Sequence, residues 1–191
     1  MRPGGLFRLA AALYLVLALG GLAWIGVQRG GIPASLFLPR AADWWVDPLA
    51  GAAGAGALLL AWWAARRWGI ARQLEITLRE RLGPLTVAEA YGLALISGVA
   101  EEVLFRGAVQ PAWGFYPATL IFAALHSGRG RAMLLWTTSA LAAGAVLGAL
   151  MLWRGTLFAP IVCHVLVNAV QLRRLLATPP EATPVAPRPP A

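Results

Sequence analysis

Six polar side chains interrupt stretches of this sequence that are otherwise apolar: Glu101, Glu102, Arg106, His126, His164 and Asn168. Carboxylates and imidazoles are the side chains that most often move protons in hydrolysis. Imidazole and amide N–H groups can stabilise the oxyanion that forms when a carbonyl is attacked. Single buried histidines are usually structural, but the chain's only two histidines accompany a glutamate pair, and this combination predicts acid–base chemistry in an apolar setting.

The spacing of these residues predicts which of their side chains lie on the same face of a helix. Glu102 and Arg106 are four residues apart with the glutamate first, which favours an ion pair on one helix face. Glu101 points about 100° away from Glu102 and can project into a cavity as a general base. His164 and Asn168 are also four residues apart, so their side chains share a helix face and can donate to one oxygen.

The elements that must position these groups are membrane helices. The 191-residue chain is 59% hydrophobic and 13% charged, with a mean hydropathy of +0.68, whereas soluble domains have about a quarter of charged residues. A helix needs about 20 apolar residues to cross a bilayer, and six apolar runs cover 9–27, 49–65, 87–109, 117–125, 132–153 and 156–172. We predict an all-α, polytopic transmembrane helical bundle with about six membrane segments, the fourth short or re-entrant.

Helix geometry predicts that three of the polar residues meet at one depth. At about 1.5 Å of rise per residue, Glu101 and His126 each lie ~14 Å from the turn that joins their helices, and His164 lies ~12 Å beyond the start of its own. The short fourth segment then leaves a vestibule open to the cytoplasmic side, with the polar layer at its floor.

Arginine placement predicts the orientation of the bundle. The net charge is +8 with 16 basic residues, and alternating the spans from a cytoplasmic amino terminus puts twelve arginines on that side and three on the other. This is a positive-inside pattern rather than a nucleic-acid surface, so we expect no nucleic-acid partner. The sequence is typical of a multi-pass protein of a bacterial plasma membrane with both termini cytoplasmic.

We divide the chain into three parts. Residues 1–85 form an anchor of two retained spans plus an amphipathic surface helix, Ile70 to Leu82, that Gly83-Pro84 stops. Residues 86–175 form the core, which opens with a capping box at Thr86 and Glu89, and residues 176–191 form a disordered Pro-rich tail. Two further features are minor: Gly144 and Gly148 allow close helix contact, and the lone Cys163 excludes an internal disulfide.

The polar residues resemble three motifs of the CPBP intramembrane proteases, a family that includes type II CAAX prenyl endopeptidases and bacteriocin self-immunity proteins. Glu101-Glu102-x-x-x-Arg106 resembles the first motif, Phe122-x-x-x-His126 the second and His164-x-x-x-Asn168 the third, in the family's order. The resemblance implies peptide-bond hydrolysis in the membrane. It gives water activation to Glu101 with His126, oxyanion stabilisation to His164 with Asn168, and ordering of the site to Glu102 with Arg106.

Alternative functions stay open at this point. The same Glu and two His side chains form a plausible zinc set, but the chain lacks His-Glu-x-x-His, and we favour a metal-free mechanism without a cofactor. A non-catalytic scaffold or immunity protein and a proton-coupled transporter are alternatives of other classes. Membrane lipid and a peptide or membrane-protein substrate are the expected partners, and no residue pattern identifies the substrate, its lipidation or an oligomeric state.

Overall fold

The computed structural model describes residues 5–177, and every regular element in this part of the chain is helical. The elements that build the bundle are α1 (Gly5–Arg29), α2 (Val46–Ala65), α3 (Gly69–Leu82), α4 (Val87–Glu102), a π-helical segment η3 (Val103–Val109), α5 (Gln110–Trp113), α6 (Phe115–Leu125), α7 (Arg131–Arg154) and α8 (Phe158–Ala177). Two 3-10 turns, η1 (Ala34–Leu36) and η2 (Ala41–Asp43), lie between α1 and α2. The predicted all-α fold is confirmed.

The helices are those of a multi-pass membrane protein. Four of them, α1, α2, α7 and α8, are long and apolar enough to cross a bilayer, and the run Val87–Trp113 gives a fifth when it is counted together with α3. Helix α6 has 11 residues and is too short to cross, as its sequence predicted. Helix α8 extends to Ala177, beyond the predicted end at Leu172, and the rest of the predicted Pro-rich tail lies outside the described residues.

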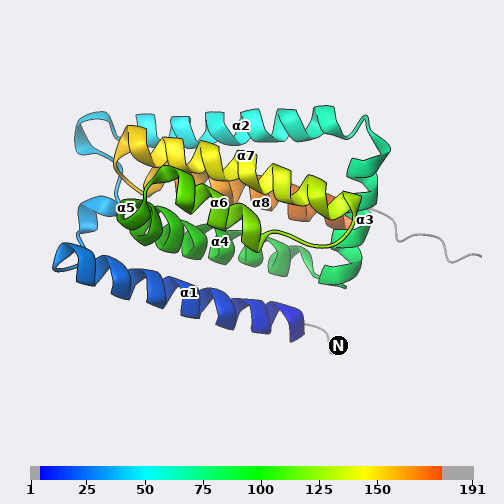
Figure 1. Cartoon of the computed structure of the whole chain (residues 1–191), viewed down its shortest axis with the longest axis horizontal. Helices are drawn as coiled ribbons and strands as arrows, with labels where there is room; N and C mark the ends of the chain where they lie inside the picture. Colours follow the sequence, from blue (N-terminus) through cyan, green and yellow to red (C-terminus); the bar gives the residue numbers. More distant parts are fainter. Residues whose placement is uncertain (1–4, 178–191) are drawn as a thin grey trace, which may run out of the picture.

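The long helices lie side by side, and α3 crosses one end of the bundle at 99° to the helix that follows it (Figure 1). The start of α1, the connection between α6 and α7, and the end of α8 all lie at the end where α3 lies. The arginine-rich connections therefore gather at one end, which is the alternation that the sequence predicted.

Helix α3 is held against the bundle by a buried carboxylate and an apolar face. Glu75 accepts a hydrogen bond from Trp62 Nε1 on α2 at 3.2 Å and pairs with Arg66 Nε at 3.0 Å. Ala71 and Leu74 are fully buried in a cluster that α2 and α7 complete. Since α3 ends at Leu82, the predicted amphipathic helix and its stop are confirmed.

The predicted capping box opens α4. Thr86 Oγ1 accepts from the backbone N–H of Glu89 at 3.2 Å, and Glu89 Oε2 accepts from the backbone N–H of Thr86 at 2.8 Å. This reciprocal pair satisfies two donors that the first helical turn would leave without partners. It fixes where α4 starts, and hence the level at which Glu101 lies.

Two glycines let α7 approach the core helices closely, as predicted. The backbone carbonyl of Gly144 accepts from Arg106 Nη2 at 3.1 Å, and that of Gly148 accepts from Gln110 Nε2 at 3.0 Å. A Cβ atom added at Gly148 would lie 2.8 Å from the Phe115 ring. Small residues on α7 therefore expose backbone oxygens to the helix that carries the polar site.

Candidate active site

The first motif lies where α4 turns into the π-helical segment η3. Glu102 is fully buried, Arg106 is 1% exposed, and Arg106 Nη1 lies 3.1 Å from Glu102 Oε1. The predicted ion pair is therefore present. The sequence had predicted a regular helix through this stretch, and the wider π turn is a feature that it did not reveal. Single π turns often occur at functional sites.

Arg106 also contacts groups on two other helices. Its Nη2 donates to the Gly144 carbonyl on α7, and its guanidinium carbon lies 4.6 Å from the centre of the Phe122 ring on α6. A buried cation of this kind is tolerated because it donates hydrogen bonds to Glu102 and Gly144 and its charge faces a carboxylate. Phe122, the first residue of the second motif, thus makes a cation–π contact with Arg106.

His164 on α8 is oriented by the same carboxylate. Its Nδ1 lies 2.7 Å from Glu102 Oε1, and because a carboxylate only accepts, Nδ1 carries the hydrogen. The other ring nitrogen, Nε2, lies 4.0 Å from Glu101 Oε2. Glu102 therefore accepts from both a guanidinium and an imidazole through one oxygen, and it turns the free nitrogen of His164 toward Glu101.

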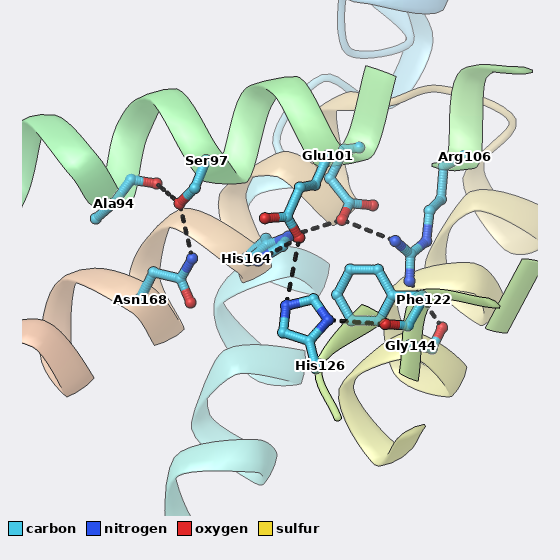
Figure 2. A network of polar contacts seen from close by, with 10 residues as sticks. Ala94, Ser97, Glu101, Arg106, Phe122, His126, Gly144, His164 and Asn168 are labelled. Carbon is cyan, nitrogen blue, oxygen red and sulfur yellow. Dashed lines mark hydrogen bonds and ion pairs between the residues drawn. The ribbon is translucent and has the colours of Figure 1, made fainter. Parts of the chain in front are cut away.

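His126 follows the last residue of α6, so it lies one position beyond the helix on which the sequence placed it. Its Nδ1 lies 2.7 Å from the backbone oxygen of Phe122, which only accepts, so Nδ1 carries the hydrogen and Nε2 has a free lone pair. Nε2 lies 3.8 Å from Glu101 Oε2 (Figure 2). The backbone oxygen of His126 accepts from Thr137 on α7 at 3.1 Å, which fixes the end of α6.

Glu101 is the point on which both imidazoles converge. It is 7% exposed, and its Oε2 is buried without a hydrogen-bond partner among the described residues. The distances from Oε2 to the two Nε2 atoms are too long for direct hydrogen bonds. Glu101 Oε2 on α4, His126 Nε2 just after α6 and His164 Nε2 on α8 thus face one small volume. The sequence predicted that these three residues meet at one depth.

Asn168 lies one turn beyond His164 and is held by a residue that sequence reasoning missed. Asn168 Nδ2 donates to Ser97 Oγ at 3.0 Å, and Ser97 Oγ lies 3.4 Å from the carbonyl of Ala94. Ser97 precedes Glu101 by four residues, so the i,i+4 rule could have found it. The amide keeps a second N–H, which is free to face the cavity.

A cavity of about 490 Å³ connects these groups to the end of the bundle where α3 lies. Glu101, His126, His164 and Asn168 line it, whereas Glu102 and Arg106 are not among its lining residues. Trp62, Glu75, Arg81 and Leu82 line it where α3 meets the bundle, and its remaining walls are mostly apolar. Tyr14 of α1 also lines the cavity, although the sequence analysis did not single it out.

The predicted site residues therefore form two groups. Four face the cavity, and the Glu102 and Arg106 pair supports them from behind. A metal needs ligands gathered around one point, and among residues 5–177 no group of three or more His, Cys, Asp or Glu side chains is arranged to hold one. We therefore keep the metal-free mechanism as the proposal and zinc as the alternative that experiment has to separate from it.

Comparison with known proteins identifies the class of the core. Residues 83–170 match the model of the family described as type II CAAX prenyl endopeptidase Rce1-like. The resemblance seen in the three motifs is therefore confirmed, and the segment similar to the Rce1-like family contains all six predicted site residues.

One curated relative is similar over part of the chain. The uncharacterized protein YpbD of Bacillus subtilis (strain 168) is 41% identical over 78 residues, which is 41% of this chain and 41% of the relative. The similarity thus spans about two fifths of the relative's length. No solved structure matches the chain.

Proposed function

We propose that the protein is a membrane-embedded endopeptidase that hydrolyses a peptide bond with water activated by Glu101 and His126. The observation that carries the proposal is the buried, unpartnered Oε2 of Glu101, which faces the free Nε2 atoms of two histidines inside a cavity. The Rce1-like domain supports it, because the family is one of endopeptidases.

The water is activated between the carboxylate and the imidazole. Separations of 3.8 and 4.0 Å suit a water molecule that bridges Glu101 Oε2 to the two imidazoles. Glu101 takes one proton from this water, and the lone pair of His126 Nε2 orients it. The resulting hydroxide attacks the carbonyl carbon of the substrate, and the carbonyl π bond opens to an oxyanion.

The oxyanion is stabilised by the two donors on α8. His164 Nε2, when protonated, and the second N–H of Asn168 donate to it, and Glu102 stabilises the His164 imidazolium through Nδ1. The proton held by Glu101 then passes to the leaving nitrogen, the C–N bond breaks, and a carboxylic acid and an amine are released. Glu102 and Arg106 act only through His164, so they are positioning residues.

The substrate class follows from the walls of the cavity. Its mostly apolar lining favours a peptide or membrane-protein segment that arrives from the membrane rather than a highly charged soluble peptide. Entry is from the end where α3 lies, because the cavity lining includes residues of that helix.

The test compares Glu101→Gln with Glu80→Gln, which changes an exposed glutamate of α3 in the same way. Membrane peptides from cells carrying each variant are profiled by mass spectrometry, and cleavage of the peptides that differ is repeated with purified protein. Glu101→Gln should abolish turnover, because the base is lost, while Glu80→Gln should match the wild type. Equal cleavage by the two variants would reject Glu101 as the base.

A chelator separates the metal-free mechanism from the zinc alternative. Protein treated with a strong chelator should keep its activity and should contain no stoichiometric zinc by elemental analysis. If activity is lost and then returns with added zinc, the chemistry assigned to Glu101 and His126 is wrong and these side chains are metal ligands instead.

A further inference from the structure

Helix α1 precedes the Rce1-like segment, yet one of its faces lies against the helix that carries the glutamate pair. α1 runs beside α4 in the same direction (Figure 1). Residues seven apart share a helix face, and this face carries four such residues: Phe7, Tyr14, Gly21 and Gln28. Tyr14 has the one hydroxyl group between Arg8 and Gln28, so a polar side chain is placed on a face that packs against the site.

Contacts on both sides of Tyr14 fix its level along α4. A Cβ atom added at Gly92 would lie 3.1 Å from the Phe7 ring, and Gln28 Nε2 donates to the backbone carbonyl of Ala108 at 3.1 Å. Tyr14 lies between these two contacts, as Glu101 does on the neighbouring helix. The register of α1 thus follows from packing on either side of the tyrosine.

Tyr14 and Glu101 meet in the cavity. Both side chains line it, and the contacts of Phe7 and Gln28 place Tyr14 on the face of α1 that packs against α4. Glu101 Oε2 faces the histidines without a hydrogen-bond partner, so a donor to the other oxygen would both stabilise this buried charge and set its orientation.

We infer that Tyr14 is a positioning residue of the active site, whose hydroxyl donates a hydrogen bond to the Glu101 carboxylate and holds its other oxygen toward the two histidines. The inference rests on the proposed function and extends it, because it makes α1 a part of the active site in addition to a membrane anchor. It also ties the Rce1-like segment to a residue outside that segment.

Removing the hydroxyl has a defined effect on the orientation of Glu101. The titratable groups that approach this carboxylate are His126 after α6 and His164 on α8. Glu75 and Arg81 of α3 line the same cavity, and α7 adds only uncharged side chains to its lining. The tyrosine hydroxyl is a neutral donor, so without it the carboxylate is held less firmly toward the two histidines.

The experiment compares Tyr14→Phe with Tyr116→Phe, which removes a hydroxyl from a tyrosine that is 76% exposed. Tyr14→Phe keeps the ring and its packing, so the variant should fold like the wild type. Its kcat should fall about tenfold or more, as expected for one lost hydrogen bond to a charged group, with KM changed less than about twofold. Tyr116→Phe should change neither kcat nor KM.

A second measurement does not depend on turnover. Infrared difference spectra report the Glu101 carboxylate band, identified by its loss in Glu101→Gln. The frequency of this band depends on the hydrogen bonds that the carboxylate accepts, so it should shift in Tyr14→Phe and not in Tyr116→Phe. A shifted band in a protein that cleaves no peptide would support the contact and reject the proposed function. An unshifted band, with or without turnover, would overturn the inference.

Discussion

Glu102 shows why two adjacent glutamates in one apolar helix serve different purposes. The Arg106 guanidinium and the His164 imidazole both approach its Oε1, so its charge is balanced and its direction is fixed. Within residues 5–177 no arginine forms an ion pair with Glu101, and its Oε2 faces the histidines across 3.8 and 4.0 Å. The sequence predicted this difference: Glu102 is neutralised by Arg106, and Glu101 faces the cavity.

We expect Arg106→Ala to lower stability as well as activity. The change leaves Glu102 as a buried charge without its cation, and breaking one partner of a buried pair typically costs about 3–5 kcal/mol. Thermal unfolding in detergent measures the loss. Arg72→Ala, which removes an exposed arginine from α3, is the matched control and should unfold like the wild type.

The double variant tests whether the charge itself is the cause. Adding Glu102→Gln to Arg106→Ala removes the unpaired carboxylate, so part of the lost stability should return, although the hydrogen bond from Arg106 to Gly144 stays broken. If the double variant is no more stable than Arg106→Ala, the destabilisation comes from the lost contacts with Phe122 and Gly144 and not from the charge.

At the scale of single residues, the sequence predicted the polar set but not all of its supports. Glu101, His126 and His164 stand out because ionisable groups are rare in apolar spans. Ser97 and Tyr14 carry no charge and are common in such helices, so nothing local marks them. Their role depends on which helices become neighbours, and this is decided by the packing of the whole bundle.

At the scale of elements, glycines decide how closely the helices approach each other. A Cβ atom added at Gly51 on α2 would lie 2.6 Å from the backbone oxygen of Ala159 and 2.8 Å from Val162 on α8. A backbone oxygen cannot rotate away as a side chain can. Helices α2 and α8 must therefore separate if this glycine is replaced, and α8 carries His164 and Asn168.

We expect Gly51→Ala to destabilise the protein by about 1–3 kcal/mol, the usual cost of overpacking, and to lower turnover with it. Gly56→Ala on the same helix is the control, because an added Cβ atom there meets nothing within 4 Å. Since alanine favours a helix over glycine, Gly56→Ala should be neutral or slightly stabilising. Equal unfolding midpoints for both variants would show that α2 and α8 can separate without cost.

Local chemistry explains which elements were predictable. The spans, the short α6, the capping box at Thr86 and the stop after Leu82 each follow from neighbouring residues, and the structure has them all. The π turn of η3 was not predictable in this way. A π turn gives up regular α-helical hydrogen bonds, and contacts such as that of Arg106 with Gly144 on α7 must offset the loss.

At the scale of the whole molecule, charge is distributed along the long axis of the bundle. Three described arginines belong to the opposite end: Arg29, Arg40 and Arg154. Ten belong to the connections and helix ends on the α3 side: Arg8, Arg66, Arg67, Arg72, Arg79, Arg81, Arg129, Arg131, Arg173 and Arg174. By the positive-inside rule we expect this side to face the cytoplasm, so that the mouth of the cavity would open there.

Single cysteines at the two ends test this orientation. Cys163 is fully buried and is first replaced by alanine. Arg129→Cys then reports on the connection between α6 and α7, and Leu38→Cys, at a residue that is 58% exposed, reports on the opposite end. Gly130 is unsuitable for labelling because its φ of +97° strains any other residue.

An impermeant maleimide should label Arg129→Cys in inside-out membrane vesicles and Leu38→Cys in right-side-out vesicles, because each thiol is exposed on one side of the bilayer only. Labelling each preparation after detergent permeabilisation controls for thiols that are folded but unreactive. The reverse pattern would place α3 and the cavity mouth outside the cytoplasm. Substrates would then have to reach Glu101 from the external side, while the chemistry proposed for Glu101, His126 and His164 would be unaffected.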